Sequence, residues 1–60
     1  MKKIRLYKNR NGVFVIEKDG IEEYYFTIGS FLEDVEALSK DGYFEISNNV
    51  WELVSPIFRQ

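Results

Sequence analysis

The sequence predicts an α+β domain with the element order β-β-β-α-β-β, built as an antiparallel sheet or a small, partly open barrel with one helix. Residues 2–28 alternate in hydrophobicity and are divided by two turn-forming dipeptides, Asn11-Gly12 and Asp19-Gly20. Residues 29–42 change to a helical period, and residues 43–54 return to alternation. Residues 1–60 are expected to form a single domain, because a chain this short holds one core at most.

The first three predicted strands cover residues 2–8, 13–18 and 21–28. Both dipeptides favour type I′ turns, whose two central positions need the positive φ that Asn, Asp and Gly tolerate. With two-residue turns, the face expected to receive the helix carries Ile4, Leu6, Val13, Val15, Tyr24, Phe26 and Ile28. The opposite face carries Tyr7, Phe14, Ile16 and Tyr25. The second turn also sets Glu17 opposite Glu22, which is unfavourable and leaves a longer turn as the alternative.

The helix is predicted from the spacing of Phe31, Val35 and Leu38, with Ser30 as its N-cap and Gly42 just beyond its end. A C-terminal hairpin follows, with strands at 43–47 and 50–54 joined by Asn48-Asn49. This hairpin would pair Phe44 with Leu53 and Ile46 with Trp51, and Pro56 would end it.

One helix can pack against only one face of the predicted sheet, so the apolar residues of the other face must be buried by something else. Two covers remain open in the sequence: closure of a small barrel by the C-terminal hairpin, or a second copy of the chain in a homodimer. An aromatic face left uncovered by both would be a docking surface.

Catalytic and metal-binding side chains are scarce. The chain has no His and no Cys, so it lacks the commonest general base, the strongest nucleophile and the usual zinc ligands. We therefore expect a non-enzymatic protein without cofactor or metal. The lack of Cys, of a signal peptide and of a long apolar run also predicts a cytoplasmic protein with no membrane partner.

Charges are segregated along the chain, although the net charge is only -2. The first sixteen residues contain cations and no acid, and all ten acids lie between residues 17 and 52. Basic and aromatic side chains gather in the first hairpin, where they would suit single-stranded nucleic acid: Lys3, Arg5, Tyr7, Lys8, Arg10 and Phe14. The alternative interpretation is an edge strand that its Lys and Arg side chains keep soluble. The net negative charge of the chain favours this alternative.

A second, acidic group of side chains follows in the sequence. The candidate protein-binding residues are Glu22, Glu23, Tyr24, Tyr25, Glu33, Asp34, Glu36 and Asp41. Carboxylates beside exposed aromatic rings can occupy a basic groove in place of the phosphates of DNA. A solvated helix face is the alternative interpretation.

Residues 19–54 resemble the small phage-encoded inhibitors of uracil-DNA glycosylase. The resemblance is carried by Asp19-Gly20, by Tyr24-Tyr25-Phe26, by the acidic helix at residues 34–38 and by Glu45-Ile46. It implies a homodimeric inhibitor that occludes the DNA-binding groove of the enzyme, and it carries over onto Tyr24, Tyr25, Asp34 and Glu36. Val35 and Ser39 stand where the family helix has aromatic residues. The sequence thus predicts a protein-binding inhibitor of a DNA-processing enzyme, with nucleic-acid binding by the basic first hairpin as the alternative.

Overall fold

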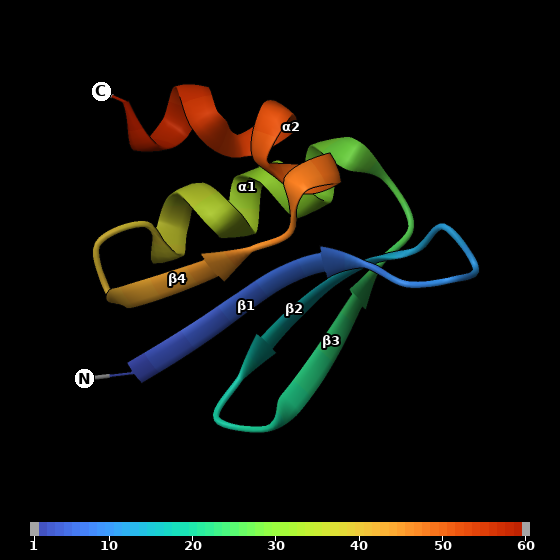
Figure 1. Ribbon diagram of the computed structural model, residues 1–60, viewed down its shortest axis with the longest axis horizontal. Helices are drawn as coiled ribbons and strands as arrows, with labels where there is room; N and C mark the ends of the chain where they lie inside the picture. The colour runs from blue at the N-terminus through green and yellow to red at the C-terminus, as the bar shows by residue number, and fades with distance from the viewer. Residues whose placement is uncertain (1, 60) are drawn as a thin grey trace.

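The computed structural model describes residues 2–59 and confirms the α+β class, with two helices on one side of a four-stranded sheet (Figure 1). The elements are β1 (Lys2–Lys8), β2 (Phe14–Lys18), β3 (Ile21–Tyr25), α1 (Ile28–Leu38), β4 (Gly42–Ile46) and α2 (Asn48–Phe58). The strand order is β3-β2-β1-β4, in which β1 is antiparallel to β2 and parallel to β4. The sheet is mixed and open, so it is neither wholly antiparallel nor closed into a barrel.

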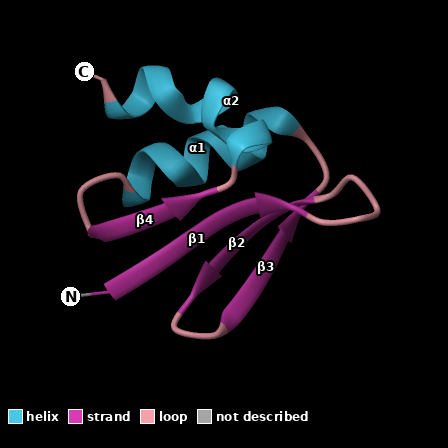
Figure 2. Cartoon of the chain, in the orientation of Figure 1, coloured by secondary structure: helices cyan, strands magenta, loops and turns pink. Residues whose placement is uncertain are grey.

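The predicted fifth strand is wrong, because residues 50–54 belong to helix α2 (Figure 2). Val50, Val54 and Ile57 recur at helical spacing, and the first two are fully buried. The helical spacing extends over residues 50–57, whereas the alternation that predicted a strand covers only residues 50–54. Asn48-Asn49 accordingly opens a helix rather than a hairpin, and Pro56 lies inside that helix.

Strand β4 reaches β1 in parallel because α1 carries the chain back along the sheet. The contact continues past the strand, where the Ser47 N–H donates to the Leu6 carbonyl at 3.1 Å. Helix α2 then packs its Phe58 ring against Phe44 of β4, with ring centroids 4.8 Å apart. The C-terminal helix thus joins α1 on the same side of the sheet, whereas closure by the predicted hairpin would have covered the opposite face.

The connection between β1 and β2 is longer than the predicted two-residue turn, and the Asn9 side chain organises it. Its Oδ1 accepts hydrogen bonds from the backbone N–H groups of Asn11 at 2.9 Å and Val13 at 3.0 Å. The Gly12 N–H donates to the Asn9 carbonyl at 2.9 Å. Such side-chain bonds to nearby backbone are typical of Asn in turns.

This loop shifts the strand register by one residue. Leu6 pairs with Ile16, whereas a two-residue turn would have set Leu6 opposite Glu17. A shift of one residue exchanges the two faces of a strand, so the predicted division of β2 and β3 between the faces is wrong. Phe14, Ile16 and Tyr25 were predicted on the opposite face, but they lie with Ile4 and Leu6 on the face that the helices cover. The open face of the sheet carries Tyr7, Val15 and Tyr24, while Phe26 and Ile28 lie beyond β3.

The second turn matches the prediction. Asp19 and Gly20 both have positive φ, 52° and 84°, and Lys18 pairs directly with Ile21. Glu17 therefore does stand opposite Glu22. The longer turn is not needed, because side chains of β1 approach both carboxylates.

Helix α1 begins three residues earlier than predicted. Thr27 is the N-cap, and its side chain accepts a hydrogen bond from the Ser30 N–H at 3.2 Å. The helix ends with Ser39 as its C-cap, and Gly42 already belongs to β4. The predicted capping roles of Ser30 and Gly42 are therefore wrong, while the helix itself is confirmed.

One hydrophobic core lies between the sheet and the two helices. Phe31 of α1 is fully buried at its centre, stacked on Phe14 at 4.7 Å and edge-on to Tyr25 at 5.9 Å between ring centroids. The core consists of Ile4, Leu6, Phe14, Ile16, Phe31, Val35, Val50 and Val54. Every element except β3 and β4 supplies at least one fully enclosed side chain.

We expect Phe31→Ala to lower the free energy of unfolding by about 3–5 kcal/mol, because it removes both ring contacts and leaves a cavity. Urea unfolding followed by circular dichroism measures this loss. Ile21→Ala is the control, since Ile21 is 69% exposed and its loss should stay within about 0.5 kcal/mol. Equal losses of unfolding free energy in the two variants would contradict the central position of Phe31 in the core.

Two glycines provide an opposed pair of stability predictions. Gly29 lies in α1 with open space at its Cβ position, so Gly29→Ala should raise the free energy of unfolding by roughly 0.5–1 kcal/mol. Gly20 has a φ of +84°, so Gly20→Ala should lower it by about 1–2 kcal/mol. Thermal unfolding of both variants measures the signs, and the same sign in both would contradict this backbone geometry.

Candidate protein-binding surface

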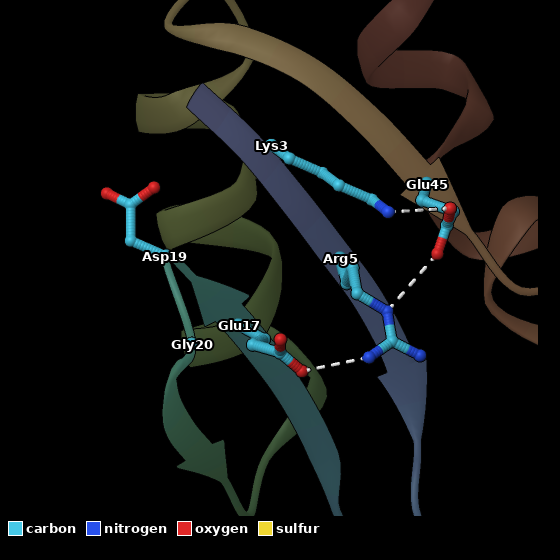
Figure 3. A pocket seen from close by; sticks show the side chains of 6 residues that line it. All are labelled: Lys3, Arg5, Glu17, Asp19, Gly20 and Glu45. Atoms are coloured by element: carbon cyan, nitrogen blue, oxygen red, sulfur yellow. Dashed lines mark hydrogen bonds and ion pairs between the residues drawn. The ribbon is translucent and has the colours of Figure 1, made fainter. Parts of the chain in front are cut away.

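The open face of the sheet is crossed by a row of ion pairs centred on Arg5. Its Nη1 lies 3.1 Å from Glu17 Oε1 and its Nε lies 3.2 Å from Glu45 Oε1, so Arg5 links β2 to β4 (Figure 3). Lys3 Nζ adds a contact of 3.2 Å to Glu45 Oε2. These carboxylates pair with Lys3 and Arg5 of β1 from both neighbouring strands.

The hollow beside these ion pairs has a volume of about 280 Å³. It is lined by Lys3, Arg5, Glu17, Asp19, Gly20 and Glu45 (Figure 3). Both cations in its lining are already paired, so an incoming anion would have to displace a carboxylate. The hollow is therefore poorly suited to phosphate.

Glu22 of β3 is held by two tyrosines on the same open face. The Tyr7 hydroxyl donates to Glu22 Oε2, and the Tyr24 hydroxyl donates to Glu22 Oε1 at 2.8 Å. The Tyr7 bond, followed by the Tyr24 bond, lowers the pKa of Glu22, because both favour the carboxylate. The same bond to Glu22 raises the pKa of Tyr7 to about 12. Between the two tyrosines, Val15 is completely shielded from solvent.

A second tyrosine and carboxylate cluster joins β3 to α1 on the other side of the strand. The Tyr25 hydroxyl lies 2.6 Å from Asp34 Oδ2 and 3.4 Å from Glu23 Oε1. Burial against the core, followed by the bond to Asp34, raises the pKa of Tyr25. The hydroxyl remains a donor at neutral pH and fixes the Asp34 side chain beside the strand.

We call Glu22, Glu23 and Asp34, with Tyr24 and Tyr25, the β3–α1 acidic surface. Within residues 3–59, the ion pairs between side chains involve Glu17 and Glu45 and none of these three carboxylates. Five of the ten acids therefore fall into two groups. Glu17 and Glu45 are ion-paired with cations of β1, and the three acids of the β3–α1 acidic surface accept hydrogen bonds from tyrosine hydroxyl groups.

The other predicted acidic residues lie elsewhere. Glu33 and Glu36 border a groove of about 380 Å³ between the two helices. Asp41 follows the C-terminal end of α1, at the end of the helix opposite its junction with β3 (Figure 1). The eight predicted residues therefore form no single patch, although five of them form the β3–α1 acidic surface.

The predicted basic surface is largely engaged within the molecule. Lys3 and Arg5 form the ion pairs described above, and Tyr7 is bonded to Glu22. Lys8 Nζ lies 5.3 Å from the centre of the Phe14 ring, which is only 7% exposed and stacks on the core. Phe14 therefore has no free ring face for a base, and Arg10 stands apart in the loop after β1.

Sequence reasoning missed the apolar lining of the groove between α1 and α2. Besides Gly29, this lining comes from Leu32, Leu53, Pro56 and Ile57. The helical period of residues 50–58 was the signal that could have revealed it. Sequence reasoning also missed Glu17 and Glu45 as the partners of Arg5, which only the strand order brings together.

Comparison with protein-family models, curated proteins and solved structures found no match for this chain. In the part of the chain that the structure describes, no group of three or more His, Cys, Asp and Glu side chains could hold a metal ion. None of the helices described has the length and apolar character needed to cross a membrane.

The raised pKa of Tyr7 predicts a loss of stability at alkaline pH. The unfolded chain releases the Tyr7 proton near pH 10, whereas the folded protein keeps it until about pH 12. The contribution is therefore complete below pH 10 and is lost as the pH rises toward 12. We expect the free energy of unfolding of Tyr7→Phe to fall less steeply over this range than that of the wild type. Urea unfolding at intervals from pH 9 to pH 12 tests this, and parallel curves would contradict it.

Proposed function

We propose that this chain is a non-enzymatic protein-binding module that inhibits a nucleic-acid-processing enzyme by occluding its basic binding groove. The observation that carries the proposal is that tyrosine hydroxyl groups hold three carboxylates beside β3. Glu17 and Glu45 are ion-paired with β1, whereas Glu22, Glu23 and Asp34 form no ion pair among the described residues. Their unsatisfied charge is available to a cationic partner.

Tyrosine hydroxyls prepare these carboxylates for binding. Glu22 is fixed by Tyr7 and Tyr24, and Asp34 is fixed by Tyr25. A side chain already held in place loses little conformational freedom when a Lys or Arg of the partner contacts it. The free oxygen lone pairs of each carboxylate can still accept charge-assisted hydrogen bonds.

The bordering rings suit a protein partner. Tyr24 is 53% exposed beside Glu22, and aromatic side chains are enriched at protein interfaces. Fixed carboxylates on the two sides of β3 also steer a positively charged protein from a distance, as the phosphates of DNA do. The resemblance of residues 19–54 to inhibitors of uracil-DNA glycosylase supports the same class of target, and the absence of Cys suits a cytoplasmic setting.

Affinity capture tests the proposal. The chain is immobilised, exposed to cell extract at about 50 mM salt and eluted at high salt, which screens charge pairs. We expect mass spectrometry to identify an enzyme with a basic nucleic-acid groove. Glu22→Gln/Asp34→Asn should weaken its retention at least tenfold, because each lost charged contact is worth about 1.5–3 kcal/mol.

The matched control is Glu33→Gln/Glu36→Gln, which removes the same number of charges away from the β3–α1 acidic surface and should retain the enzyme as the wild type does. The recovered enzyme is then assayed on its DNA substrate, where the chain should inhibit it and added duplex DNA should relieve the inhibition. Equal retention by the two double variants would contradict the proposal. Retardation of a labelled single-stranded oligonucleotide by the chain alone would instead favour the nucleic-acid-binding alternative.

A further inference from the structure

The segment from β3 to the start of α1 carries most of the exposed large hydrophobic side chains of the described residues. Seven large hydrophobic side chains are exposed among the described residues, and four of them lie within residues 21–28: Ile21 at 69%, Tyr24 at 53%, Phe26 at 83% and Ile28 at 49%. Strand β3 is the outermost strand and has only β2 beside it (Figure 1). Its other edge carries unpaired backbone groups, which are a template for another strand.

The turn before β3 determines which backbone groups face this edge. In a hairpin closed by a two-residue turn, the residues that flank the turn exchange both hydrogen bonds, and the bonded pairs then alternate. Lys18 and Ile21 flank the turn, so Ile21, Glu23 and Tyr25 direct their N–H and C=O groups to β2. Glu22 and Tyr24 direct theirs to the free edge.

We propose that two copies of this chain form a symmetric dimer in which their β3 strands pair antiparallel, with Tyr24 facing Tyr24 of the second copy on the two-fold axis. The two sheets then join into one continuous sheet. Tyr24 exchanges two backbone hydrogen bonds with its counterpart, and Glu22 lies opposite Phe26 of the second copy.

Charge and the end of β3 together select this register from its neighbours. Placing Tyr25 on the axis would require Thr27 and Ile28 to extend the strand, but Thr27 caps α1 and Ile28 begins it. Symmetric pairing of the outward-facing residues also allows Glu22 or Glu23 to lie on the axis. The first register sets Glu22 against Glu22 of the second copy, and the second does the same with Glu23. Like charges directly opposite each other in a sheet are unfavourable. With Tyr24 on the axis, no acid faces an acid, and Glu23 lies opposite Tyr25 of the second copy.

Aromatic side chains reinforce the same register. Tyr24 faces its counterpart on the open face of the sheet, and Phe26, which follows the strand, lies diagonally across from it. Aromatic cross-strand pairs are among the stabilising pairs of antiparallel sheets. The other free edge, β4, has Tyr43 as its one exposed large hydrophobic residue in the described chain. A second copy therefore fits the β3 edge better than it fits the β4 edge.

The dimer goes beyond the proposed function, and although it shares Tyr24 with the β3–α1 acidic surface, it is measured separately. Edge pairing uses backbone groups, while the carboxylates of Glu22, Glu23 and Asp34 stand on the two faces of the joined sheet. Self-association is measured without any enzyme, so either proposal can fail while the other holds.

Disulfide trapping tests the register. Tyr24→Cys introduces the sole cysteine of the chain on the two-fold axis. The Cα atoms of a hydrogen-bonded pair lie about 5.5 Å apart, within the range that a disulfide spans. Under air oxidation we expect a covalent dimer in non-reducing electrophoresis. Glu23→Cys is the matched control on the same strand and should cross-link at least tenfold more slowly. Cross-linking of Glu23→Cys at an equal or higher rate would overturn the register.

Molar mass in solution tests the dimer itself. Light scattering over a concentration series should rise toward twice the 7.1 kDa of one chain for the wild type. Tyr24→Lys places two like charges on the axis and should remain at 7.1 kDa. Tyr43→Lys adds the same charge at the other edge and should behave as the wild type does. A wild-type mass of 7.1 kDa up to the solubility limit, or equal masses for the two variants, would overturn the proposal.

Discussion

The side chain of Asn9 supplies the constraint on which the rest of the structure depends, because it sets the register of β1 against β2. Its two hydrogen bonds to backbone N–H groups build a loop that places Lys8 opposite Phe14. Phe14 consequently points to the helices and stacks on Phe31. The two-residue turn between β2 and β3 then fixes which side chains of β3 lie on the same face as Phe14. A single side chain in a loop therefore decides which apolar residues form the core.

The same register distributes the charges. It sets Arg5 opposite Glu17, and the parallel pairing with β4 sets Arg5 opposite Glu45. Lys3 and Arg5 are thus paired with acids from two later strands, although they are separated from these acids in sequence. The unfavourable pairing of Glu17 with Glu22 is relieved from the same side, because Arg5 contacts the first carboxylate and Tyr7 the second. Glu23 and Asp34 lie on the other side of β3 and are held by Tyr25 instead.

Local signals in the sequence were sufficient for four strands, the helix α1 and the Asp19-Gly20 turn. These local signals failed where one short sequence pattern is compatible with two types of secondary structure. Residues 50–54 fit an alternating strand and a helix equally well, and burial of Val50 and Val54 against the sheet decided for the helix. Asn11-Gly12 is a strong turn signal, yet the hydrogen bonds of Asn9 produced a longer loop. The β3–α1 acidic surface was predicted in its residues but not in its boundaries, because the distance from Asp41 to β3 depends on tertiary structure.

The location of the exposed apolar surface changes the interpretation of the uncovered sheet face. Both helices lie on one side, so the open face has no helix over it (Figure 2). Its apolar residue Val15 is nevertheless fully buried, because Tyr7 and Tyr24 flank it on the neighbouring strands. The ion pairs of Arg5 occupy the rest of that face. The face is therefore satisfied within one molecule, and the unsatisfied groups are the carboxylates of the β3–α1 acidic surface and the backbone edge beside them. Strand β3 therefore carries both a free backbone edge and two of these three carboxylates.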